Sequence, residues 1–204
     1  MSAEKLKTEV RKEQIAEAAL EVAARNGIGG LNVAGIARRV GLVPSAIYRH
    51  YTCKDEILDA VFEVIGDRLV GNVWTVRAET PKALERLHRL LRMHVAFIRE
   101  NQGVVRIVFS DDVFANPERQ DKVFGMIQRY LRDVADIVSE GQVAGEIRPN
   151  IEPATVAMMF LGMIQPAAIL WRMSEGKFDV TRHIEKAWLL FCDAIRRQDT
   201  KGER

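Results

Sequence analysis

Residues 32–57 read NVAGIARRVGLVPSAIYRHYTCKDEI, and this stretch decides the fold. Asn32 is a good N-cap for a short helix over 33–40, and Gly41 is suited to end it because a residue without a Cβ readily adopts a left-handed backbone. The residues GLVP (41–44) then lead into a second short helix over 45–51. Two short helices joined by a glycine turn are typical of a helix-turn-helix, whose second helix enters the major groove of DNA.

The charge around this stretch favours a polyanionic partner. No acidic residue lies between Glu21 and Asp55, whereas several arginines and His50 do. Residues 1–54 carry a net positive charge and residues 55–204 a slight negative one, within a formal total of +2. A basic segment that contains a helix-turn-helix pattern predicts binding to double-stranded DNA.

The order and spacing of these residues resemble the DNA-binding domain of the TetR family of transcriptional regulators. The resemblance covers residues 11–65, from a first helix reading IAEAALEVAARNG (15–27) to the segment IYRHYTCKDEI (47–57). It implies that Asn32 and Lys54 hold phosphates at the starts of their helices, and that Tyr48 and His50 also contact the DNA backbone. It places four residues nearest to the base edges: Pro44, Ser45, Ala46 and Arg49.

Two features of this segment affect how it would read DNA. Pro44 and Ala46 carry no hydrogen-bonding side chain, so base recognition would depend on Ser45, Arg49, contacts with thymine methyl groups and DNA shape. Cys53 stands where a helix-capping residue is usual. It has two interpretations, a weak cap and a redox-sensitive thiol near a helix start, and we favour the weak cap.

Helical periodicity continues through the rest of the chain. We expect helices that begin at Lys54, Pro81 and Pro117, a short element over 104–110, a loop over 111–117, and two last helices over about 153–175 and 179–198. The predicted fold class is all-α, with about nine helices. A three-helix DNA-binding domain would span 1–53, an antiparallel bundle for ligand binding and dimerisation 54–200, and a frayed tail 201–204, the roles of the bundle being those that the resemblance implies.

Composition excludes several other classes of protein. The chain has 204 residues, 48% of them hydrophobic and 28% charged, with two cysteines that cannot form a disulfide framework. The histidines have no metal-ligand spacing, and the HExxH, P-loop, GxGxxG and GxSxG motifs are absent. We therefore expect a non-enzyme without metal or cofactor. The first 14 residues lack the apolar core of a secretory signal, which predicts a cytoplasmic protein.

The segment 153–171 contains no charged residue and is long enough to span a bilayer. It includes Thr155, Gln165 and Pro166, and no second segment of this kind accompanies it. A helix that is apolar all round is more simply one that is buried on both sides, by its own domain and by a partner chain. We therefore expect no membrane association.

The second half of the chain is rich in methionine and aromatic residues, which suit a site for apolar or amphipathic ligands. A plain helical core would have the same composition. The TetR resemblance favours a ligand pocket, for which the candidate lining residues are Phe97, Phe109, Met126, Tyr130, Met159, Met163 and Trp171.

The last two helices carry more apolar surface than a small bundle needs to bury, which predicts a homodimer through a four-helix bundle, as the resemblance also implies. The candidate interface residues are Met158, Leu161, Trp188, Phe191 and Ile195. A two-fold dimer would present two recognition helices about 34–36 Å apart, which matches a palindromic operator.

Together these patterns predict a sequence-specific DNA-binding transcriptional regulator. We expect a repressor that leaves its operator when a small, largely apolar ligand binds the C-terminal domain, with segment 54–78 as the connection between the two functions. The alternative is a TetR-like nucleoid-associated or cell-division protein that binds DNA without a small-molecule inducer.

Overall fold

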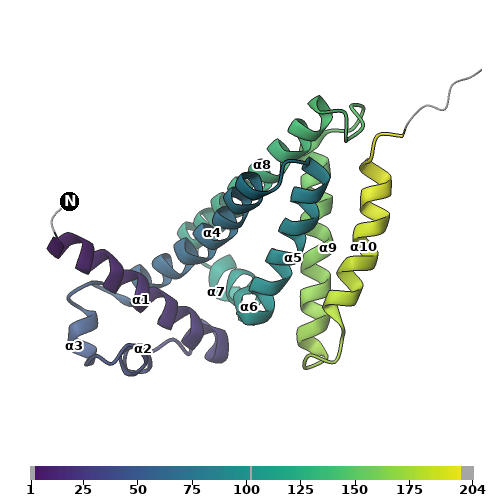
Figure 1. Cartoon of the computed structure of the whole chain (residues 1–204). Helices are drawn as coiled ribbons and strands as arrows, with labels where there is room; N and C mark the ends of the chain where they lie inside the picture. Colours follow the sequence, from purple (N-terminus) through teal and green to yellow (C-terminus); the bar gives the residue numbers. More distant parts are fainter. Residues whose placement is uncertain (1–2, 102, 199–204) are drawn as a thin grey trace, which may run out of the picture. The chain divides into compact units, whose positions relative to one another are not determined.

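The structure is a computed structural model that describes residues 3–101 and 103–198. These residues form ten α-helices and no β-strand (Figure 1). The helices are α1 (Ala3–Asn26), α2 (Val33–Arg39), α3 (Pro44–Ile47), α4 (Lys54–Glu79), α5 (Ala83–Glu100), α6 (Val104–Val108), α7 (Asp111–Phe114), α8 (Pro117–Val143), α9 (Pro153–Met173) and α10 (Val180–Ile195). The predicted all-α class is confirmed, and the predicted tail 201–204 lies outside the described residues.

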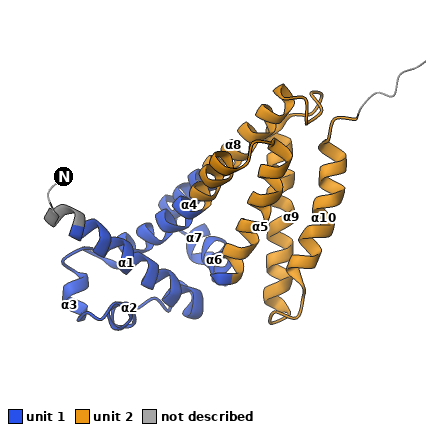
Figure 2. Cartoon of the chain, in the orientation of Figure 1, with its two compact units in different colours: residues 1–68, 100–127 blue, residues 69–99, 128–204 orange. Residues whose placement is uncertain are grey.

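The chain divides into two compact units, which Figure 2 shows in different colours. The first unit comprises residues 1–68 and 100–127, and the second comprises residues 69–99 and 128–204. The long helices α4 and α8 each contribute to both units. The predicted DNA-binding segment 1–53 lies wholly within the first unit, which also takes in α6, α7 and the beginnings of α4 and α8.

In the first unit α2 packs against both α1 and α3. Asn32 caps α2 as predicted, because its Oδ1 accepts a hydrogen bond of 2.7 Å from the backbone N–H of Gly35. Gly41 has a φ of +68°, the left-handed conformation that its position in the turn requires. Ile36 and Ile47 have no exposed surface, so each of the two short helices is anchored by one isoleucine.

Two predictions about short elements were wrong. The helix expected over 45–51 is regular only over Pro44–Ile47. Beyond it the amides of Arg49 and His50 bond to carbonyls three residues back, at 3.3 and 2.9 Å, whereas that of Tyr51 bonds four residues back, to Ile47 at 3.1 Å. This mixed winding does not continue the regular helix. The stretch 111–117, expected as a loop, contains α7, because buried Val113 anchors one turn that starts on the carbonyl of Ser110.

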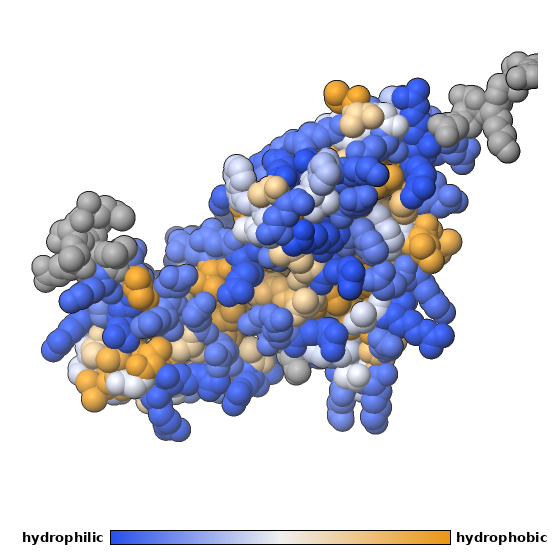
Figure 3. All heavy atoms as spheres, viewed as in Figure 1, coloured by the Kyte–Doolittle hydropathy of each residue, from blue (hydrophilic) through white to orange (hydrophobic). Residues whose placement is uncertain are grey.

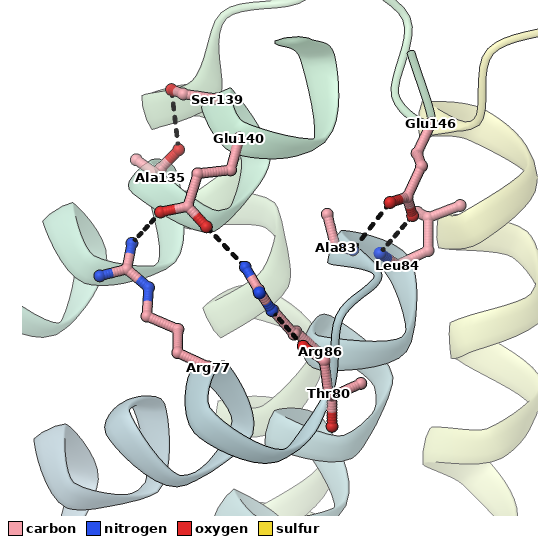
Figure 4. A network of polar contacts seen from close by, with 9 residues as sticks. All are labelled: Arg77, Thr80, Ala83, Leu84, Arg86, Ala135, Ser139, Glu140 and Glu146. Atoms are coloured by element: carbon pink, nitrogen blue, oxygen red, sulfur yellow. Dashed lines mark hydrogen bonds and ion pairs between the residues drawn. The ribbon is translucent and has the colours of Figure 1, made fainter. Parts of the chain in front are cut away.

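The second unit is built from α5, α9, α10 and the later parts of α4 and α8. Polar contacts hold these helices together at one place (Figure 4). Glu140 of α8 accepts from Arg77 of α4 at 2.8 Å and from Arg86 of α5 at 2.6 Å. Glu146 accepts from the first backbone amides of α5, at Ala83 and Leu84, and so satisfies N–H groups that have no partner within the helix.

Helix α9 contains the uncharged segment 153–171, which is long enough to span a bilayer. It is the one described helix that is long and apolar enough to cross a bilayer. One side of it packs against α10, and its buried residues include Val156, Phe160 and Ile164. Its ends at Pro153 and Met173 lie close to the predicted limits. The packing against α10 agrees with the prediction of a helix buried by its own domain.

Candidate DNA-binding surface and effector region

The predicted base-reading residues lie on the open side of α3 and the turn that follows it. Pro44, Ser45 and Arg49 are exposed and Ala46 is half-buried, while Ile47 between them points into the core. Tyr48 is 52% exposed, although tyrosine side chains are usually at least partly buried. This arrangement leaves the outer side of the segment free to meet a DNA groove.

His50 lies at the edge of the same surface and is half-buried. Its Nδ1 is enclosed and has no hydrogen-bond partner among the described residues. The other ring nitrogen, Nε2, is therefore the one through which His50 can make a hydrogen bond to DNA. An Nε2–H donor is what a contact with a DNA phosphate requires.

The two helix starts implied to hold phosphates differ in what their side chains do. Asn32 is exposed, but its amide is already engaged, with Oδ1 on the Gly35 amide and Nδ2 donating to the carbonyl of Gly30 at 3.2 Å. Lys54 is half-buried at the first position of α4 and makes no ion pair within the described residues. Lys54 is therefore the better placed of the two side chains to bind a phosphate.

Cys53, just before α4, is exposed, and a hydrogen-bonded turn joins the residue before it to the first turn of α4. Glu56 reaches back to Thr52 and accepts hydrogen bonds from its backbone N–H at 2.6 Å and from its hydroxyl at 2.7 Å. The backbone hydrogen bond, followed by that from the hydroxyl, lowers the pKa of Glu56. Tyr51, beside Thr52, is buried and donates its hydroxyl to the carbonyl of Lys12 at 3.0 Å, which ties this segment to α1.

A contact between α6 and α1 was not predicted from the sequence. Gly103, just before α6, lies so close to α1 that a Cβ built on it would be 1.9 Å from the Cα of Ala24. Arg106 of α6 donates to the carbonyl of Arg25 at 3.3 Å, and its Nη2 would be 2.8 Å from a Cβ built on Gly27. A positive charge at the last turn of a helix stabilises it. Helix α6 is thus attached to the C-terminal end of α1.

The seven candidate ligand-binding residues are divided between the two units. Phe97 and Tyr130 are buried in the second unit, where Met163 and Trp171 are half-buried and Met159 is 55% exposed. Phe109 and Met126 belong to the first unit, with Phe109 exposed and Met126 packed near Gly66. Met159 therefore lines no enclosed cavity of a single chain.

His94, which the sequence does not mark as a candidate, is buried and paired with the candidate residue Tyr130. His94 lies on the apolar side of α5, and its Nδ1 is 2.9 Å from the hydroxyl of Tyr130 on α8. Burial lowers the pKa of His94 to about 4, so the imidazole is neutral at pH 7. The sequence does contain a signal for this burial. His94 lies three residues after Leu91 and four after Leu90, which places it on the leucine-rich face of the helix.

Four of the five candidate interface residues lie in the core of the second unit. Leu161, Trp188, Phe191 and Ile195 are between 3% and 7% exposed, and they offer little surface to a partner. Only Met158 is open, at 55%. The apolar side chains that α9 and α10 do expose are Met158, Met159, Ile169, Leu170, Met173, Leu189 and Leu190. Figure 3 shows hydrophobic atoms at the outer edge of the surface over α10.

Two family models match the chain. Residues 15–61 match the bacterial regulatory proteins of the tetR family, and residues 80–195 match a tetracyclin repressor-like C-terminal domain. The chain belongs to the TetR family. It is accordingly a DNA-binding transcriptional regulator. The match over residues 15–61 includes the helix-turn-helix formed by α2 and α3.

The similar proteins include a nucleoid occlusion factor and a regulator of fatty acid metabolism. The nucleoid occlusion factor SlmA of Vibrio vulnificus (strain YJ016) is 24% identical over 188 residues, which are 91% of this chain and 96% of that protein. The fatty acid metabolism regulator protein of Bacillus subtilis (strain 168) is 25% identical over 167 residues, 82% of this chain and 86% of its own. The crystal structure of FadR from Bacillus subtilis in complex with stearoyl-CoA has the same fold, with a TM-score of 0.76 at 24% identity over 89% of this chain and 98% of that one.

Proposed function

We propose that this chain is a cytoplasmic, homodimeric repressor that leaves a palindromic operator when a fatty acyl thioester binds the second unit. The contact of α6 with α1 carries the proposal. Helix α6 follows α5 in the chain after only three residues, and it is attached at Ala24 and Arg25 to the helix that supports the DNA-reading segment. A ligand that moved α5 would therefore displace α1 through a short, direct connection.

The apolar class of effector is supported by two observations. The second unit is a helical bundle with a core of leucine, isoleucine, valine and aromatic side chains, which suits a long hydrocarbon chain better than a polar ligand. Two of the similar solved structures have a fatty acid metabolism name or a bound stearoyl-CoA. A long-chain acyl-CoA is accordingly the first ligand to test.

The dimer would form through the exposed apolar side of α9 and α10. Leu189 and Leu190 are 68% and 77% exposed on α10, and Met173 is 77% exposed at the end of α9. Single chains rarely leave so many large apolar side chains on two adjacent helices in water. A second copy that packs its own α9 and α10 against them would form a four-helix bundle and would pair the two reading segments.

The energetics of release follow from linkage between the two sites. An effector shifts the equilibrium only by its preference for the conformation that does not bind DNA. To take the dimer from almost fully bound to almost fully free, this preference must be about 10⁴-fold. By the same thermodynamic cycle, operator DNA must weaken effector binding by an equal factor.

The test is fluorescence anisotropy of the purified full chain on the DNA upstream of its own gene, with excess unrelated duplex as competitor. We expect binding that survives the competitor and is lost on addition of stearoyl-CoA, but not of free coenzyme A. Binding that the unrelated duplex removes equally well would refute an operator-specific repressor.

A nucleoid-associated role is the second candidate, favoured by the similarity to SlmA over 91% of the chain. It predicts binding sites scattered over the chromosome and DNA affinity that does not respond to acyl-CoA. Chromatin immunoprecipitation with sequencing separates the two functions, since a local repressor should occupy one or a few promoters.

A further inference from the structure

The buried pair of His94 and Tyr130 stands out because the surrounding core is apolar. Apart from tyrosine, tryptophan and cysteine, His94 is the only buried residue of the described chain with a polar side chain, at 6% exposure. Tyr130 is 2% exposed, its hydroxyl oxygen lies 2.9 Å from Nδ1 of His94, and the two rings meet edge to face at 5.2 Å. Both residues belong to the second unit, His94 on α5 and Tyr130 on α8.

The protons of this pair can be assigned from the partners that are present. The Tyr130 hydroxyl has one hydrogen-bond partner among the described residues, Nδ1 of His94, and a buried hydroxyl donates whenever it has an acceptor. Burial raises the pKa of Tyr130 and lowers that of His94, so both groups are neutral at pH 7. Tyr130 therefore donates to Nδ1, and the imidazole carries its own proton on Nε2.

The Nε2–H group of His94 has no acceptor within the part of the chain that the structure describes. Among the described residues, the enclosed polar side-chain atoms without a partner are His50 Nδ1 and Arg77 Nε. His94 as a whole keeps 6% of its surface exposed. A leucine at this position, like Leu87, Leu90 and Leu91 on the same face of α5, would avoid an unpaired buried donor altogether.

We propose that His94 is the polar recognition residue of the effector site, and that its Nε2–H donates to an uncharged carbonyl oxygen of an otherwise apolar ligand. Tyr130 is the positioning residue, since it fixes the ring and the tautomer that exposes the donor. The inference rests on the proposed function, and it specifies which atom of the effector is recognised.

An uncharged acceptor fits this site better than a carboxylate. No lysine or arginine is buried in the described core, so a carboxylate at Nε2 would lose its hydration without gaining a counter-charge. The neutral imidazole does not supply that charge, because it resists protonation at pH 7. A thioester, ester or ketone oxygen needs only the single hydrogen bond that His94 offers.

The test compares two ligands that differ only in the carbonyl group: stearoyl-CoA, and S-octadecyl-CoA, in which a methylene replaces that carbonyl. Isothermal titration calorimetry on the full chain should show that the wild type binds stearoyl-CoA about tenfold more tightly, a preference of about 1.4 kcal/mol. His94→Leu should bind both ligands equally, and His94→Gln should keep part of the preference because its amide N–H reaches a similar position.

Two further variants separate positioning from packing. Tyr130→Phe should reduce the preference, and ¹⁵N NMR of the imidazole should show that the single Nε2–H tautomer of the wild type is lost. His88→Gln is the matched control, since His88 is on the same helix but pairs with Glu185 at 2.8 Å, and it should keep the full wild-type preference.

The outcomes distinguish this inference from the function on which it rests. A wild type that binds both ligands equally, or a His94→Leu variant that keeps the preference, overturns the role of His94 and leaves the acyl-CoA effector standing. A wild type that binds neither ligand overturns the acyl-CoA effector, and the carbonyl contact with it. If His94→Leu does not fold, the His94→Gln and Tyr130→Phe variants carry the same comparison.

Discussion

Replacing Gly103 with alanine tests the contact between α6 and α1 directly. The backbone of Gly103 has φ −91° and ψ −8°, which alanine adopts without strain, so the effect comes from space alone. The new Cβ would lie 1.9 Å from the Cα and 2.2 Å from the Cβ of Ala24, where ordinary contacts are 3.4–4 Å. The atoms in the way belong to the backbone of α1 or are bonded to it, so a side chain cannot simply rotate aside. Either α1 or α6 must therefore shift by about 1.5–2 Å.

This displacement should lower both the stability of the fold and the affinity for the operator. Inserting a methyl group into a well-packed contact typically costs about 1–3 kcal/mol. For a chain of this size, each kcal/mol lowers the melting temperature by roughly 2–4 °C, which gives a decrease of about 2–12 °C. If the contact stabilises the DNA-binding conformation, the same energy corresponds to a loss of operator affinity of about 5- to 150-fold.

The assays are thermal unfolding followed by circular dichroism, and operator binding measured well below the transition. Gly125→Ala is the matched control, because Gly125 lies in α8 and a Cβ there meets no atom within 4 Å. Alanine is the better helix former, so this variant should be as stable as the wild type or about 1 kcal/mol more stable. A Gly103→Ala variant with wild-type melting temperature and wild-type operator affinity would refute the close packing of α6 on α1 and its role in coupling.

Three further predictions concern other parts of the molecule. Leu190→Glu should convert the dimer into monomers in light scattering after gel filtration, and a variant that stays dimeric would place the interface elsewhere. Lys54→Ala should weaken binding to all duplexes alike and reduce the slope of log affinity against log salt by about 1 per lost phosphate contact; loss of affinity for the operator alone would contradict a phosphate contact. The pKa of His94 falls from 6.5 to about 4 on folding, so between these pH values the unfolded chain binds a proton that the folded chain does not. The free energy of unfolding contributed by His94 should therefore decrease as the pH falls from 6.5 to about 4. Denaturant titrations of wild type and His94→Leu measure this, and parallel pH profiles would show that His94 is not buried.

The sequence predicted the helical framework because its boundaries are set by local chemistry. Asn32 caps α2, Gly41 takes the left-handed turn, and Lys54 and Pro117 open their helices as expected. Helix α7 escaped prediction because one turn has no periodicity to detect, and it forms because Val113 finds a buried position. Helix α3 ends earlier than expected because the chain turns more tightly through His50, and no residue pattern in the sequence predicts that turn.

The proposed dimer surface shows what helical periodicity alone does not determine. The stripe containing Trp188 and Phe191 correctly marked an apolar side of α10, but an apolar stripe does not say which neighbour covers it. In the structure that neighbour is the chain itself, since Phe191 lies 6.1 Å from Phe160 of α9, between ring centroids. The exposed pair Leu189 and Leu190 lies off this stripe, so the periodicity does not mark it.

The residues of the effector region were least accessible to sequence reasoning. Methionine and aromatic content marked the second half as suitable for an apolar ligand, but composition does not distinguish a core position such as Phe97 from an exposed one such as Met159. His94 was overlooked because one histidine has no spacing signature. Its partner Tyr130 lies 36 positions away, and only the packing of α8 against α5 brings the two together.

The central claim is that DNA binding and effector binding are coupled, and one pair of titrations tests it most directly. Calorimetric titration of stearoyl-CoA into the free dimer and into the dimer saturated with operator gives two dissociation constants. The account predicts weaker binding in the presence of the operator, by the same factor by which saturating stearoyl-CoA weakens operator binding. Equal affinity for stearoyl-CoA with and without operator would contradict it.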